Sequence, residues 1–274
     1  MKNLRGPVIT AALTLALAVA GCAKDATDDK AAAKPSDPKA ALAASTSGLT
    51  AGNYAFSESM PDAELKGTVH VPSKSASVAI DSHAADGAGK LEMLQIEPDR
   101  WVRMSFDLDS MLQGVDRNDP AMKPLLEGLK AFDGKTWMHL DLSKAENAQD
   151  LNIDLSRADV TGAGQLLSGV VTAHGDAHDI TGTLDATKAG DDLDEFDSED
   201  VKAMGAAAKA LPFTAKLDDQ GRLSHLELTV PQAGETPAGR WTVDVTGYGT
   251  QQPLTKPAGN VEEMPASGYE MLSN

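Results

Sequence analysis

Apolar and polar residues alternate along most of the chain after Gly52, and this period of two predicts β-strands. Five such runs lie between residues 54 and 108, separated by residues that favour turns. In the fourth run the apolar phase shifts between Met93 and Leu94, which predicts a β-bulge. Five short strands at this spacing predict an antiparallel meander. Their apolar positions are Tyr54 and Phe56; Leu65, Val69 and Val71; Ala76, Val78 and Ile80; Leu91, Met93, Leu94 and Ile96; and Val102, Met104, Phe106 and Leu108.

The rest of the chain mixes helical and strand patterns. Asp37 and Pro38 predict the start of a short helix, which Gly48 is expected to end. The residues after Gly249 contain several prolines, which predict an extended or loose tail. Between these ends the pattern predicts a helix within 109–132, a strand over 137–140, helix and loop over 151–171, a strand over 180–186, a helix over 198–211, strands over 213–217 and 226–230 joined by a turn, and a last strand over 241–245.

These elements predict an α+β fold of about nine strands and three or four helices. An antiparallel sheet of that size tends to curl. Helices laid against its concave face would complete the second layer of the domain. The expected architecture is therefore a curled antiparallel sheet, an open half-barrel, with helices on the concave face.

The N-terminus carries the pattern of a signal peptide. Lys2 and Arg5 precede the uncharged, mostly apolar stretch 8–20. This stretch is shorter than the apolar segment that a transmembrane helix needs, and it fits a signal peptide. The stretch ends at Ala20, and Gly21 and Cys22, the only cysteine of the chain, follow directly. This resembles the bacterial lipobox, in which a diacylglyceryl group joins the thiol and the signal is cut between Gly21 and Cys22. The alternative is a plain secretory signal with an incidental cysteine.

The lipobox interpretation divides the chain into three parts. Residues 1–21 are a lipoprotein signal peptide, residues 22–37 a flexible tether, and residues 38–274 a single lipoprotein domain with a loose tail from about residue 250. Acyl chains on Cys22, such as palmitate, would anchor the protein firmly. We expect a location on the extracytoplasmic face of the cell membrane, with the membrane itself as one partner.

Composition and motifs argue against several other functions. A net charge of −17 is unfavourable for binding nucleic acid. The common signatures of serine hydrolases, zinc proteases and phosphate-binding loops are absent from the sequence, which predicts no enzyme and no cofactor. His174 and His178 have a spacing that could hold Zn²⁺ on a helix, but Gly175 favours a solvated turn. The acidic run 191–200 lacks the Gly and Glu positions of a calcium-binding EF-hand loop, which favours a solvated loop.

Several short stretches resemble a known family of envelope proteins. They are the lipobox at Cys22 and residues 132–137, 179–187, 211–215 and 245–249. Together they are similar to the lipid-carrying envelope lipoproteins of actinobacteria of the LppX and LprG type. The resemblance implies a LolA/LppX-like curled sheet, resembling an opened barrel, with helices over its mouth. It also implies a lipid or glycolipid ligand whose acyl chains lie between the two layers.

The alternating apolar positions allow two functions. If they line a cavity, the protein binds or carries a lipid. If they form a close-packed core, the protein is an interaction or assembly module for an envelope partner that the sequence does not name. The candidate lipid-facing residues are Val69, Val71, Val78, Ile80, Leu94, Ile96, Val102, Met104 and Phe106.

Overall fold

The computed structural model describes most of the chain after Pro35. The predicted signal peptide, Cys22, almost all of the tether, most of the predicted helix 109–132 and residues 191–197 of the acidic run lie outside the described residues. None of the helices within the described residues is long and apolar enough to cross a membrane. The described residues are 36–83, 88–106, 116, 119–122, 126, 129, 132–144, 151–188, 198–233 and 237–272.

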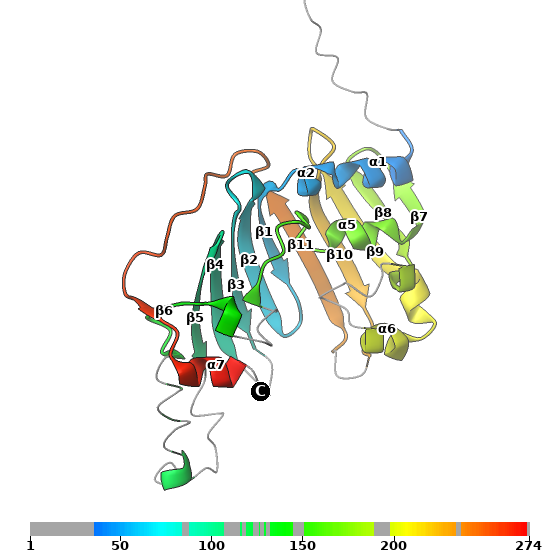
Figure 1. Ribbon diagram of the computed structural model, residues 1–274. Coiled ribbons are helices and arrows are strands. Elements are labelled where there is room, and N and C mark those ends of the chain that lie inside the picture. The colour runs from blue at the N-terminus through cyan, green and yellow to red at the C-terminus, as the bar shows by residue number, and fades with distance from the viewer. Residues whose placement is uncertain are drawn as a thin grey trace, which may run out of the picture. The chain divides into compact units, whose positions relative to one another are not determined.

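The fold is α+β, as predicted, and its described residues contain one large, unclosed sheet of 12 strands (Figure 1). The spatial order is β12-β6-β5-β4-β3-β2-β1-β11-β10-β9-β8-β7, and all neighbours are antiparallel except β12 and β6. The strands are β1 (Asn53–Ser59), β2 (Ala63–His70), β3 (Ser75–Ser82), β4 (Gly89–Ile96), β5 (Asp99–Phe106), β6 (Trp137–His139), β7 (Val170–Gly175), β8 (Asp179–Leu184), β9 (Leu211–Leu217), β10 (Leu223–Val230), β11 (Gly239–Thr246) and β12 (Val261–Glu263).

The first strand joins two meanders into one sheet. Strands β1 to β5 follow each other in space as they do in sequence, which confirms the predicted meander. Strands β7 to β11 form a second meander, and β11 pairs with β1 from Ala55↔Thr246 to Ser59↔Thr242. The hairpin predicted between residues 217 and 226 is the β9–β10 pair, with Gly221 in the left-handed conformation of its turn.

The helices are short. They are α1 (Pro38–Ser45), α2 (Ser47–Thr50), α5 (Ala163–Ser168), α6 (Ser198–Met204) and α7 (Ala266–Leu272). Asp37 caps α1 as predicted, because its Oδ2 accepts from the Ala40 N–H at 3.2 Å. Gly48 does not end the helix as expected, but lies inside α2, where a Cβ atom would come within 2.7 Å of the Tyr248 ring. This glycine therefore serves close packing rather than termination.

One face of the sheet, which we call the apolar face, carries the hydrophobic core. The ladder pairs Tyr54 with Val69 and Val78 with Met93, and Met93 in turn with Val102, so these residues share that face. A larger cluster of buried side chains lies over β7–β11 and β1–β3, where α1 packs against β7 and α5. Figure 1 shows α1, α2, α5 and α6 in front of this half of the sheet. A smaller cluster lies over β5 and β6.

The predicted bulge in the fourth run is wrong. Strand β4 pairs without interruption with β3, from Ser75↔Ile96 to Ser82↔Gly89, and without interruption with β5. Leu94 and Ile96 therefore point away from the apolar face. Leu94 lies opposite Trp101, and both are buried, so this part of the sheet has apolar residues on each side. In the sequence, Leu91 and Met93 on one face and Leu94 and Ile96 on the other therefore look like a single apolar series with a shift of one residue.

The residues after Thr250 are not a loose tail. They contain β12 and α7, and the side chains of Met264 and Tyr269 are buried. Strand β7 was also not predicted, and it contains His174, which the sequence pattern had placed in a loop. Both strands lie at the edges of the sheet and expose most of their side chains, so they carry no alternating apolar signal.

Candidate functional site

The apolar face continues across β2, β3, β4 and β5, and part of it is only half-buried. One row of the ladder joins Leu65, Ile80 and Leu91 to Met104 across the four strands. The first three of these side chains are half-buried, whereas Met104 is buried. We call the half-buried part the open strip; it consists of Leu65, Ile80, Leu91, Met93 and Phe106.

A crossing segment covers the apolar face at the other end of these strands. Residues 151–161 run across it and bury Ile153 and Leu155. Gln95, which is only 2% exposed, fixes the segment through both amide atoms. Its Nε2 donates to the Ile153 carbonyl at 2.9 Å, and its Oε1 accepts from the Ile153 N–H at 3.1 Å. Arg100 donates from two nitrogens to Asn152 Oδ1, at 2.9 and 2.6 Å.

Tyr54 holds the far end of the crossing segment. Its hydroxyl donates to the Ala158 carbonyl at 2.8 Å and accepts from the Val160 N–H at 3.1 Å. Burial, with the nearby charge of Asp159, raises the pKa of Tyr54 well above its ordinary value. The hydroxyl therefore stays protonated and can make both bonds at any physiological pH. Gln95 and Tyr54 therefore hold the crossing segment over one end of these strands, and the half-buried open strip lies toward their other end.

We expect Gln95→Leu to lower the free energy of unfolding by about 2 kcal/mol, because it leaves the buried N–H and C=O of Ile153 without their partners. Urea unfolding followed by circular dichroism measures the change. Gln252→Leu is the matched control, since Gln252 is exposed and should change stability little. Equal stability of the two variants would contradict the proposed role of Gln95.

The predicted lipid-facing residues fall into three groups. Val69, Val78, Ile80, Val102, Met104 and Phe106 lie on the apolar face, but only Ile80 and Phe106 belong to the open strip. Val71 lies beyond the end of β2, in a 3₁₀ turn (Val71–Ser73), and packs against the larger cluster. Leu94 and Ile96 lie on the opposite face, because β4 has no bulge, and cannot line the same surface. Leu65, Leu91 and Met93 complete the strip and were missed as candidates.

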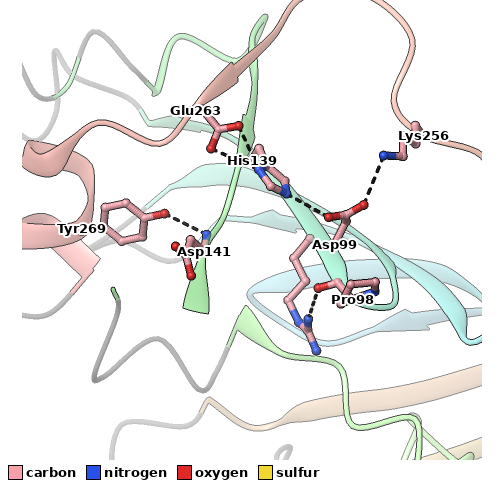
Figure 2. A network of polar contacts seen from close by, with 8 residues as sticks. Pro98, Asp99, His139, Asp141, Lys256, Glu263 and Tyr269 are labelled. Atoms are coloured by element: carbon pink, nitrogen blue, oxygen red, sulfur yellow. Dashed lines mark hydrogen bonds and ion pairs between the residues drawn. The ribbon is translucent and has the colours of Figure 1, made fainter. Parts of the chain in front are cut away.

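A polar network lies at the β5–β6 end of the sheet (Figure 2). His139 Nδ1 lies 3.0 Å from Glu263 Oε1, and its Nε2 lies 3.4 Å from Asp99 Oδ1. Lys256 Nζ lies 3.2 Å from Asp99 Oδ2 and 5.4 Å from the centre of the Trp101 ring. The hydrogen bond from Lys256, with a smaller contribution from His139, lowers the pKa of Asp99 below its ordinary value. These residues come from distant parts of the sequence, so no local pattern could have indicated them.

A separate pocket of about 420 Å³ lies between the start of α5 and the α1–α2 segment. Asp159 organises its wall, because its carboxylate accepts from Thr161 Oγ1 at 2.7 Å and from the Gly164 N–H at 2.8 Å. The lining is mixed, because six of its nine residues have polar side chains but apolar atoms form more of its surface than polar atoms do. It consists of Thr46, Thr50, Ser156, Arg157, Ala158, Asp159, Gly162, Gly164 and Gln165.

The two histidines considered for Zn²⁺ have separate environments. His174 sits in β7 opposite Thr181, and His178 Nδ1 lies 3.2 Å from the Leu217 carbonyl oxygen. Across the described ranges, no group of three or more His, Cys, Asp or Glu residues could hold a metal ion. The prediction that the protein is not an enzyme stays a prediction.

Comparison with known proteins adds no family. No protein-family model matches the chain, and no curated protein matches it. The resemblance to the LppX and LprG type therefore stays a prediction that rests on the lipobox and a few short stretches.

Proposed function

We propose that this protein is a membrane-anchored envelope lipoprotein that binds a lipid or glycolipid through its acyl chains, on the apolar face of the sheet. The observation that carries the proposal is the open strip. Leu65, Ile80 and Leu91 are large apolar side chains on neighbouring strands, and all three are half-buried. Half-buried apolar side chains on neighbouring strands leave a continuous apolar surface partly open to solvent, and such a surface can take up an apolar partner.

The shape of the strip suits an extended hydrocarbon chain. Adjacent strands lie about 4.8 Å apart, so the row from β2 to β5 is about 14 Å long. The row continues without a polar side chain from Leu65 through Ile80 to Leu91, and Met93 and Phe106 flank it. The large apolar side chains favour an acyl chain over a sugar or a charged ligand.

We propose in addition that the sheet and helices form a LolA/LppX-like half-barrel. In a LolA/LppX-like half-barrel, the apolar face is the concave one and the helices lie on it. Two features support this: the sheet is unclosed, and α1 and α5 pack over its larger buried cluster. In such a fold a ligand lies between the sheet and the covering segments, next to the crossing segment 151–161.

We also propose that the protein is attached to the membrane through Cys22. Cys22 is the only cysteine, follows two small residues and ends an apolar stretch, which together favour lipidation. Acyl chains on Cys22 would hold the domain at the extracytoplasmic face of the cell membrane. The membrane would then supply the lipid ligand, and binding of that ligand would need no cofactor.

A titration with cis-parinaric acid, a fluorescent polyene fatty acid, tests lipid binding. The chain from residue 22 with Cys22→Ala is used, so that no anchor competes for the face. We expect saturable binding with an increase in emission, reversed by excess unlabelled oleate, because the probe leaves water for an apolar site. Emission that stays at the level of the probe in buffer would contradict the proposal. It would favour the alternative function, an interaction or assembly module.

A further inference from the structure

The C-terminal segment wraps around one end of the sheet. We call residues 250–272 the C-terminal strap. The strap leaves β11 beside Asn53, whose Oδ1 accepts from the Gln251 N–H at 2.9 Å, and it passes β3, where the Leu254 N–H donates to Ser75 Oγ at 3.3 Å. It then adds β12 to β6 as the outermost strand, and ends in α7.

The strap passes from one face of the sheet to the other. Lys256 contacts Trp101, which lies on the face opposite the apolar one. Met264 and Tyr269, later in the strap, belong to the smaller buried cluster with Val102 and Met104, on the apolar face. Figure 2 shows the polar contacts that accompany this turn around the edge. The strap therefore clamps β5 and β6 from both sides.

Two of the ion pairs that hold the strap are exposed. The side chains of Lys256 and Glu263 are 71% and 78% exposed, although they pair with Asp99 and His139. Exposed ion pairs of this kind contribute little net stability, because water and salt screen them. Strand β12 is only three residues long, and its pairing with β6 is parallel. Between Lys256 and Glu263 the strap is thus held less firmly than the long antiparallel strands beside it.

The strap covers the continuation of the open strip. Leu91 pairs with Met104, and Met93 pairs with Val102, so the strip and the smaller cluster form one surface. Met264 and Tyr269 bury the β5–β6 end of that surface, and the Tyr269 hydroxyl accepts from the Asp141 N–H at 2.8 Å. Release of the strap would extend the open strip by Val102, Met104 and Met138.

We propose that the C-terminal strap gates the lipid-binding face: it releases to admit an acyl chain at the β5–β6 end and docks again over the bound chain. The gate rests on the proposed function, since it regulates the same face. The crossing segment 151–161 stays in place during this motion, because Gln95 and Tyr54 fix it through four hydrogen bonds. Opening is therefore confined to the strap.

A disulfide across β6 and β12 tests the gate. His139 and Glu263 are register partners, so the pair His139→Cys and Glu263→Cys can lock the strap. In the chain from residue 22 with Cys22→Ala, no other cysteine is present. We expect the oxidised form to take up and release cis-parinaric acid at least several-fold more slowly than the reduced form, and reductant to restore the rate. Equal rates in the two forms, with binding retained, would overturn the gate.

A second variant pair keeps the test independent of the disulfide. Lys256→Ala with Glu263→Ala removes the two exposed ion pairs of the strap with Asp99 and His139, and we expect faster exchange of the probe. Lys216→Ala with Asp179→Ala is the matched control, since it removes an exposed ion pair between β8 and β9, and we expect an unchanged rate.

Amide hydrogen exchange provides a readout without ligand: β12 should exchange much faster than β1, and equal protection would overturn the gate. If the parent chain binds no probe, the proposed function fails first, and the gate fails with it.

Discussion

Replacing Cys22 with alanine is expected to remove the protein from the membrane fraction, and to leave it either in the medium or as an uncut precursor. The Cys22 thiol is the acceptor of the diacylglyceryl group in a lipobox, and each buried CH₂ of an acyl chain contributes about 0.8 kcal/mol to membrane binding. Without the thiol, no such contribution remains. Fractionation of cells followed by immunoblotting measures the distribution, and the size of the band separates a cleaved product from a precursor.

Ala23→Ser is the matched control for this variant, because it changes the neighbouring residue and keeps the thiol. We expect that variant to remain with the membranes. A Cys22→Ala protein that is cleaved and still fractionates with membranes would show that the domain binds membranes by another route. The lipobox interpretation would then be wrong.

Leu65→Trp is expected to weaken binding of cis-parinaric acid by about tenfold, which corresponds to 1.4 kcal/mol. Leu65 is half-buried in the open strip, so an indole there would occupy space that an acyl chain needs. Lys66→Trp is the matched control. Lys66 is the next residue of β2, is exposed and points to the opposite face, so binding should not change.

Unfolding in urea distinguishes a blocked site from a damaged fold. We expect Lys66→Trp to stay within about 0.5 kcal/mol of the parent chain, as exposed substitutions usually do. Leu65→Trp should unfold at nearly the same urea concentration, because its side chain can extend into the open part of the strip. Equal loss of binding by both variants, or by neither, would contradict the placement of the ligand on this strip.

The strands were predictable where one face is apolar and the other is polar. Val102, Met104 and Phe106 alternate with polar neighbours, and β5 forms where the pattern places it. Alternation misplaces Leu94 and Ile96, because these residues and Trp101 form a second apolar patch on the opposite face of the sheet. Strand β12 forms by main-chain pairing with β6 while all three of its side chains stay exposed, so no periodic signal exists.

The candidate site was predictable as an apolar face, but the half-buried strip within that face was not. Val69 and Ile80 share the same alternation, yet Val69 is fully buried and Ile80 is half-buried. The difference comes from what lies above the sheet, and the crossing segment is positioned by Gln95, a polar residue in the apolar phase of β4. The pairing of β1 with β11 is equally non-local, since the two strands lie near opposite ends of the domain's sequence. Local patterns contain neither kind of information.

Native mass spectrometry of the chain from residue 22 with Cys22→Ala, purified from cells without detergent, tests lipid binding most directly. We expect an additional species heavier than the polypeptide, which releases a fatty acyl lipid on extraction. Leu65→Trp should carry less of that lipid, whereas Lys66→Trp should carry the same amount as the parent chain. A single species at the mass of the polypeptide, with no lipid in the extract, would contradict the account and leave the apolar face as a core that serves the fold alone.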